Sequence, residues 1–202
     1  MSFVGIADKA RINPEKILVT NYLKNNHEIE VYAGEQLNEN NRIFFGANEE
    51  EKEKFFSSLK NKKGFILLGD TIILNTKKVS GVIFKKNYDY TIAYVYFEKC
   101  LKEENAFTIN LYKNEIKEKF ISDLTKRKNF IMVEKCGIIN KEHVLCVVYN
   151  EKIQIYFGNN IDVNNKMLFS RMSKEDIQTL DEDLRNKHNL KIVVEKKKNK
   201  KN

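Results

Sequence analysis

A histidine and two cysteines lie close together in the last third of the chain, and residues of these types can bind zinc or act in nucleophilic catalysis. Cys136, His143 and Cys146 fall within about ten residues of one another. A zinc site needs clustered, regularly spaced ligands, and the sequence has no Cys-x-x-Cys pair. His143 and Cys146 are three residues apart on or beside an expected strand, so their side chains should point to opposite faces. We therefore predict neither a metal site nor a catalytic pair here.

Other chemical motifs are missing as well. The sequence contains no phosphate-binding glycine loop, no dinucleotide fingerprint and no calcium-binding loop. The odd number of cysteines (Cys100, Cys136 and Cys146) favours reduced, buried thiols over disulfides. The acidic run Asp181-Glu182-Asp183 is expected to be a solvated helix face. We predict that the protein is not an enzyme, uses no cofactor and has no small-molecule substrate.

Tyrosines are the best candidates for binding. Tyr32, Tyr96 and Tyr156 recur at matching places, and we interpret them as core residues between units, with base stacking as the alternative. A second group lies on an expected hairpin that is longer than its counterparts, and such insertions map to surface loops that often carry function. The partner-binding residues that we predict from this hairpin are Tyr88, Tyr90, Tyr94, Lys85 and Lys86.

Runs of basic residues make nucleic acid the alternative partner. Two such runs follow expected helices at matching places in the chain, where they could line one side of the molecule with positive charge. The predicted nucleic-acid-binding residues are Lys60, Lys62, Lys63, Lys126, Arg127 and Lys128. The simpler interpretation is that lysines after a helix complement the negative end of its dipole.

The elements that position these residues follow a pattern that occurs three times. Phe3 to Asn13, Phe65 to Asn75 and Phe130 to Asn140 each span ten residues. Four residues after each asparagine comes a β-branched residue, and five residues later an aromatic one. The agreement continues into later apolar runs and helical segments, which indicates tandem repeats of about 60 residues. The repeated asparagine suits a tight turn.

Each repeat is predicted to form four strands and a helix, which gives an α+β fold of three ββββα units. The predicted units are residues 1–62, 63–127 and 128–188, followed by an extra terminal strand and a Lys/Asn-rich tail over 189–202. In the second helix, apolar residues recur at Ile116, Phe120 and Leu124, so we expect this stripe to be buried.

The second strand of each unit is apolar on both faces, as in residues 144–149, although a single helix covers only one face of a sheet. The other face should therefore meet another unit. We predict one compact, pseudo-threefold body with the sheets inward and the helices outward. Residues 190–195 begin a fourth copy of the first strand. This extra strand is expected to complete the sheet of another unit. The alternative is an open edge offered to a partner.

Charge and hydropathy narrow the function. The net charge is +8, but the five lysines after residue 195 leave only +3 for the rest, unlike a dedicated DNA-binding surface. No apolar run is long enough to span a membrane and no signal peptide is evident, so we expect a cytoplasmic protein without membrane contact. The preferred function is a non-catalytic intracellular binding protein acting through protein–protein contacts. One class that fits is an inhibitor or adaptor of a larger nucleic-acid-handling enzyme, of mobile-element type, and direct nucleic-acid binding is the alternative.

Overall fold

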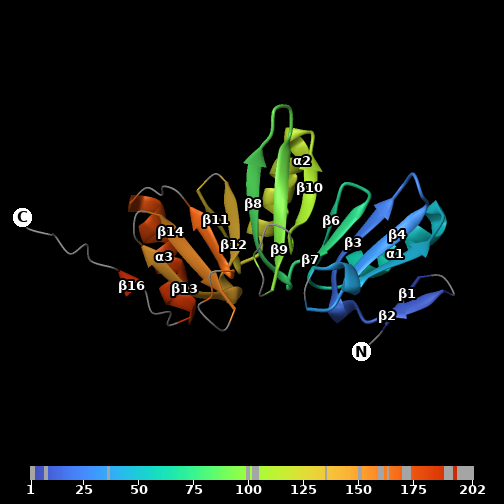
Figure 1. Cartoon of the computed structure of the whole chain (residues 1–202), viewed down its shortest axis with the longest axis horizontal. Helices are drawn as coiled ribbons and strands as arrows, with labels where there is room; N and C mark the ends of the chain where they lie inside the picture. Colours follow the sequence, from blue (N-terminus) through green and yellow to red (C-terminus); the bar gives the residue numbers. More distant parts are fainter. Residues whose placement is uncertain are drawn as a thin grey trace, which may run out of the picture.

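The chain has a mixed α+β fold of mostly antiparallel sheets with few helices (Figure 1). A computed structural model describes residues 3–6, 9–35, 37–98, 101, 105–134, 136–149, 152–158, 162, 164–169, 174–188 and 193–194. Cys100 and the basic tail 196–202 lie outside the described residues.

The elements follow a similar order in three stretches of the chain. The first stretch comprises β1 (Val4–Ile6), β2 (Ala10–Ile12), β3 (Ile17–Leu23), β4 (Glu28–Ala33), β5 (Arg42–Gly46) and α1 (Glu49–Lys60). The second comprises β6 (Phe65–Leu68), β7 (Ile72–Asn75), β8 (Val79–Lys86), β9 (Thr91–Phe97), β10 (Phe107–Leu111) and α2 (Asn114–Thr125). The third comprises β11 (Phe130–Val133), β12 (Gly137–Asn140), β13 (Val144–Tyr149), β14 (Ile153–Phe157), β15 (Lys166–Phe169) and α3 (Lys174–His188), and is followed by β16 (Val193–Val194).

The predicted count of four strands before each helix is wrong, because the run from phenylalanine to asparagine is a hairpin and not one strand. Phe65 pairs with Asn75, and the chain reverses between Leu68 and Ile72. Gly69 makes this turn with a φ of +59°, a conformation that glycine adopts without steric cost. The flanking strands are only four residues long and, apart from Asn75, apolar, so neither shows the alternation that would mark it as a separate strand.

The first two three-stranded meanders, β3-β4-β5 and β8-β9-β10, are each completed by the hairpin that follows the next helix in the chain. The first large sheet has the order β5-β4-β3-β7-β6, and the second has the order β10-β9-β8-β12-β11. The third has the order β15-β14-β13-β16, in which β16 runs parallel to β13. The extra strand predicted near the C-terminus therefore completes a sheet, although β16 takes the place next to the meander that β7 and β12 hold elsewhere.

Two buried asparagines join these hairpins to the preceding meanders. The side-chain amide of Asn75 donates to the carbonyl of Ile17 at 2.9 Å, and that of Asn140 donates to the carbonyl of Val79 at 2.9 Å. The side-chain oxygen of each also accepts a backbone N–H two residues ahead, as expected of a turn asparagine. One residue thus fixes both the turn and the attachment of its hairpin, which the spacing in sequence alone did not reveal.

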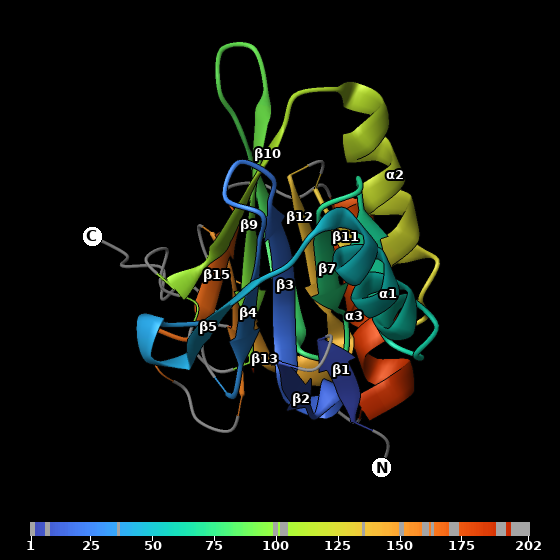
Figure 2. The same ribbon diagram turned by 90° about the vertical axis from the view of Figure 1, so that its right-hand side faces the viewer.

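The three large sheets follow one another along the long axis of the molecule (Figure 1). Figure 2 shows the three helices along one side and β5 and β15 along the other. Helix α2 contacts β6 of the first sheet as well as β10 and β11 of the second, so it lies between two sheets. The predicted pseudo-threefold body with sheets inward and helices outward is therefore not confirmed.

Apolar clusters fill the spaces between these layers. One cluster joins α1 to the first sheet through Phe55 and Ile73, and a second joins the first two sheets through residues such as Leu18, Phe120 and Val95. A third cluster joins the second and third sheets. Glycines allow close approach there: a Cβ added at Gly81 would lie 2.5 Å from Met167, and one added at Gly137 would lie 2.4 Å from Phe169.

The three repeated tyrosines differ in their surroundings. Tyr96 is buried in the cluster between the second and third sheets, and Tyr32 packs edge-to-face on Phe107 with ring centroids 6.1 Å apart. Tyr156 is only half-buried and donates to Gln154 at 3.0 Å. The interpretation as core residues between units therefore holds for Tyr32 and Tyr96, each of which packs against the next sheet along the chain.

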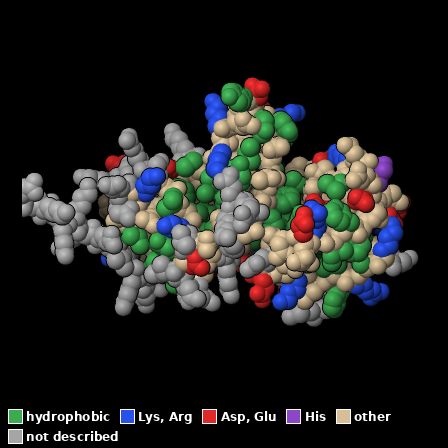
Figure 3. Space-filling view, viewed as in Figure 1, with side chains coloured by type: hydrophobic (Ala, Val, Ile, Leu, Met, Phe, Trp, Pro, Cys, Tyr) green, Lys and Arg blue, Asp and Glu red, His purple; other side chains and the backbone are tan. Residues whose placement is uncertain are grey.

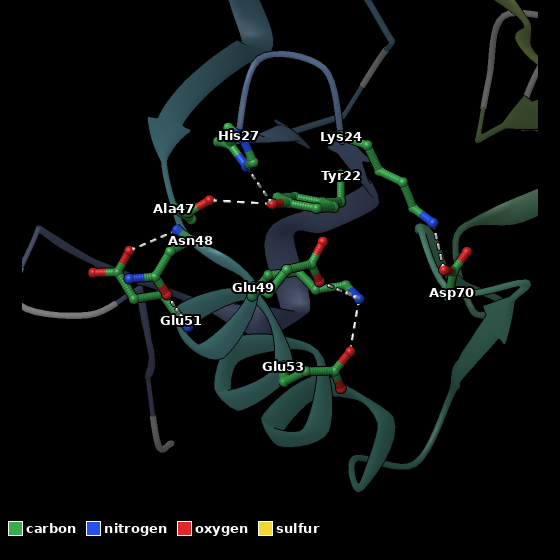
Figure 4. A network of polar contacts seen from close by, with 10 residues as sticks. Tyr22, Lys24, His27, Ala47, Asn48, Glu49, Glu51, Glu53 and Asp70 are labelled. Atoms are coloured by element: carbon green, nitrogen blue, oxygen red, sulfur yellow. Dashed lines mark hydrogen bonds and ion pairs between the residues drawn. The ribbon is translucent and has the colours of Figure 1, made fainter.

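Helix α1 begins with a capping box, which Figure 4 shows. The side chain of Asn48 accepts the backbone N–H of Glu51 at 2.9 Å, and the carboxylate of Glu51 accepts the backbone N–H of Asn48 at 3.0 Å. Lys52 is almost fully buried beside the ring of Tyr22, and its ammonium pairs with Glu49 and Glu53. These acids cap the helix or neutralise Lys52, so their roles are structural.

Truncating the central residue of the α2 stripe should strongly destabilise the fold. Phe120 is fully buried and packs edge-to-face on Phe84. We expect Phe120→Ala to lower the free energy of unfolding by about 3–5 kcal/mol, measured by urea denaturation. Ile116 was expected in the same stripe but is exposed, so Ile116→Ala is a matched control that should cost well under about 1 kcal/mol. Equal losses for the two variants would contradict this account of α2.

Candidate functional site

The hairpin that joins β8 to β9 projects from the molecule farther than its neighbours (Figures 1 and 2). Its strands, eight and seven residues long, are the longest in the described part of the chain together with β3. The turn is closed by a bond from the N–H of Asn87 to the carbonyl of Tyr90 at 2.9 Å, and the side chain of Asn87 accepts the N–H of Tyr88 at 3.0 Å. This ordered turn leaves the Tyr88 side chain 97% exposed.

A second strand–helix connection places another tyrosine beside this turn. Tyr112 lies between β10 and α2 and is exposed, and its ring centroid is 5.1 Å from that of Tyr90 with an interplanar angle of 39°. We call Tyr88, Tyr90 and Tyr112 the tyrosine tip. Figure 3 shows apolar and charged side chains gathered at this projecting end. Tyr112 was not among the predicted residues, because it lies on a separate connection that only the fold brings beside this hairpin.

The other predicted residues of this hairpin lie nearer its base. Lys85 and Lys86 are exposed on β8, and the ammonium of Lys85 lies 4.6 Å from the centroid of the Tyr94 ring. Tyr94 is half-buried and packs against the cluster between the second and third sheets. The structure thus brings Tyr88 and Tyr90 together with Tyr112 and separates Tyr94 from them.

Three of the predicted basic residues line one hollow beside α2. This hollow of about 540 Å³ is bounded by Lys60, Lys126 and Arg127, together with apolar residues of β6. The guanidinium of Arg127 donates to the carbonyl of Phe65 at 3.3 Å, and partial burial lowers the pKa of Arg127 below its ordinary value. Asp123 also lines this hollow, so its charge is not uniformly positive.

Two further predicted residues line an adjoining hollow of about 630 Å³ at the turns that precede β3 and β8. Lys62 and Lys63 lie there with Lys16, Lys77 and Lys78, and Phe65 lines both hollows. Lys78 forms an ion pair with Glu98, which also lines this hollow. Lys128, the sixth predicted residue, is exposed and lines neither hollow.

The residues considered for catalysis are held in structural contacts. The thiol of Cys136 donates to Glu134 at 3.3 Å, and burial together with this carboxylate raises the pKa of Cys136 to about 11. Burial also raises the pKa of Cys146. These two thiols are therefore protonated at neutral pH and unsuited to nucleophilic attack. Within the described residues, no group of three His, Cys, Asp or Glu side chains could hold a metal ion.

One residue of the acidic run in α3, Asp181, also makes structural contacts. The hydroxyl of Tyr149 on β13 donates to Asp181 at 2.5 Å, and burial and this carboxylate raise the pKa of Tyr149 above its ordinary value. Arg185 lies 4.0 Å from the same carboxylate. Asp181 therefore fastens α3 to the third sheet and is not solvated as predicted, whereas Glu182 of the same run is exposed, as predicted.

Comparison with known proteins supplies no family for this chain. No protein-family model matches the sequence, and the search of curated proteins finds no match. In the part of the chain that the structure describes, none of the helices has both the length and the apolar character needed to cross a membrane.

His143 should make stability depend on pH. It lies in the larger hollow, with its Nδ1 3.0 Å from the hydroxyl of Ser80, and burial lowers its pKa below the ordinary 6.5. Below about pH 6.5 the unfolded chain binds a proton at this residue that the folded chain does not. We therefore expect the free energy of unfolding to fall as the pH is lowered from 7.5 through 6.5.

Urea denaturation across this pH range measures the effect. His143→Gln should remove part of the pH dependence, because it removes the buried imidazole. A pH dependence that is the same in wild type and His143→Gln would show that His143 does not titrate in this way.

Proposed function

We propose that this protein is a non-catalytic binding protein that acts through protein–protein contacts made by the tyrosine tip. The observation that carries the proposal is the Tyr88 side chain, which an ordered turn holds almost fully exposed. An exposed aromatic ring on a rigid turn has little conformational entropy to lose on binding. Tyrosines are also enriched among the residues that dominate binding energy at protein interfaces.

The chemistry of the tip favours a particular kind of partner surface. Tyr88, Tyr90 and Tyr112 offer a flat apolar surface with hydroxyl groups, and Lys85 and Lys86 add positive charge along β8. A complementary partner would provide an apolar pocket with carboxylates on one side. A role as inhibitor or adaptor of a nucleic-acid-handling enzyme, inside the cell, remains a hypothesis within this proposal, as does the origin of the fold by tandem duplication.

Site-specific photo-cross-linking in the native host tests the tip. A photoreactive residue at position 88 should give a discrete protein adduct, whereas the same residue at exposed Met132 on β11 should not. Excess wild-type protein should compete the adduct away, and a Tyr88→Ala, Tyr112→Ala variant should compete at least about tenfold less well, since hot-spot tyrosines typically contribute 2 kcal/mol or more. Equal adducts from both positions, or equal competition, would contradict the proposal.

Direct nucleic-acid binding is a second candidate, favoured by the two adjoining hollows that together hold five of the predicted basic residues. If Lys60 and Lys126 contact phosphates, Lys60→Gln with Lys126→Gln should weaken binding of DNA or RNA. The salt dependence, the slope of log K against log salt, should then fall by about 1 for each lysine removed.

Fluorescence anisotropy at two salt concentrations measures this, with Lys85→Gln, Lys86→Gln as a charge-matched control. Binding should also survive removal of residues 196–202, so that the basic tail does not account for it. If the wild-type protein binds neither DNA nor RNA at low salt, this second candidate is eliminated.

A further inference from the structure

The first hairpin of the chain lacks the partner that the other two hairpins have. Strands β7 and β12 pair with the meander that precedes them, whereas β2 pairs only with β1 among the described residues. Burial shows the consequence: Phe65 and Phe130 are 8% and 3% exposed, but Phe3 at the matching position is 61% exposed. The β1–β2 hairpin is nevertheless in place, because β1 packs on α1.

Asn13 shows the same incomplete pairing at the level of single atoms. Its side-chain oxygen accepts the N–H of Glu15 at 3.0 Å, as the matching asparagines do with their own turns. The amides of Asn75 and Asn140 then donate to carbonyls of the preceding meander. Among the described residues, the amide of Asn13 has no such acceptor.

The opposite end of the molecule has a complementary edge. Among the described residues, no hairpin pairs with the third meander, β13-β14-β15, and β16 pairs with β13 at Val148 and Tyr149. Among the described residues, the remainder of this β13 edge has no strand beside it. Val144 occupies the place of Ile17 and Val79, whose carbonyls accept the asparagine amides. All three strands also carry a bulge at the same place, which keeps the edges geometrically alike.

The faces at the two ends are complementary as well. Phe107 on β10 packs on Tyr32 of the preceding sheet, and Met167 on β15 packs over Gly81. Ile43 holds the matching position on β5 and is 46% exposed. At the other end, Tyr156 and Leu168 lie on the outer face of the third sheet, where Leu168 is exposed.

We infer that copies of this chain associate head to tail, with the β1–β2 hairpin of one copy completing the β13-β14-β15 sheet of another. The internal junctions define the register: Ile12 would lie opposite Cys146 and Ala10 opposite Val148, as Leu74 lies opposite Val19 and Ile139 opposite Gly81. The Asn13 amide would donate to the Val144 carbonyl. The same chain cannot make this contact with itself, because the two surfaces lie at opposite ends of the long axis (Figure 1).

This arrangement has two consequences. The interface is heterologous, so association produces open chains of molecules or closed rings in place of symmetric dimers. Strand β16 competes for the same edge, and its two-residue pairing must be displaced before the hairpin of another copy can bind. The tyrosine tip lies at neither surface, so this inference does not depend on the proposed function.

Sedimentation velocity over a wide concentration range tests the inference on the full chain. The wild-type mass should rise with concentration, and Val193→Pro, which weakens β16 pairing, should strengthen association. Asn13→Asp keeps the oxygen that caps the turn but replaces the donor amide with a charge, so it should weaken association at least about tenfold. Asn38→Asp changes another turn asparagine in the same way, outside β1, β2 and β13, and should have no effect.

Disulfide trapping tests the register independently of affinity. With Cys100 and Cys136 changed to serine, Ile12→Cys should form an intermolecular disulfide with Cys146, because directly opposed residues on antiparallel strands are within disulfide range. Arg11→Cys faces the other side of the strand and should not. The inference is overturned if neither wild type nor Val193→Pro associates, if Asn13→Asp associates as strongly as wild type, or if the two cysteine positions cross-link equally.

Discussion

The structure depends on main-chain pairing between each of the first two meanders and a hairpin from farther along the chain. A sheet edge presents unpaired N–H and C=O groups that must be satisfied by another strand or by solvent. Here β7 satisfies the edge of β3 and β12 satisfies that of β8, while Asn75 and Asn140 fasten the ends of the joined strands. Because each of these hairpins joins the sheet of the stretch before it, the sheets are offset by one hairpin from the three stretches of similar element order.

Much of the architecture was accessible from the sequence because its signals are local. The asparagine turns and the burial of Phe120 and Leu124 follow from residue preference and helical spacing. The extra hairpin turn at Gly69 was missed because its two strands are short and, apart from Asn75, apolar. Spacing also could not show which meander a hairpin joins, since that depends on contacts between residues about 60 positions apart.

The residues of the candidate surfaces were likewise predictable only in part from the sequence. Tyr88 and Tyr90 were predicted from the length of their hairpin, but Tyr112 was not, because it comes from a separate connection that only the fold brings alongside. Lys60 and Lys126 were predicted to line one side, and they lie at one hollow that is also lined by β6, a strand of the first sheet. Tyr94 was grouped with the tip by its place in the sequence, although strand alternation turns its ring to the inner cluster.

Because the sheet of one stretch is completed by the hairpin of the next, the order of synthesis affects how the chain folds as it leaves the ribosome. When α1 has emerged, the first large sheet still lacks two of its five strands. It is complete only after β6 and β7 have been synthesised. The second meander likewise waits for β11 and β12. Synthesis thus proceeds with one unfinished edge at a time, and each edge is protected as soon as the following hairpin appears, which limits the period in which nascent chains could aggregate.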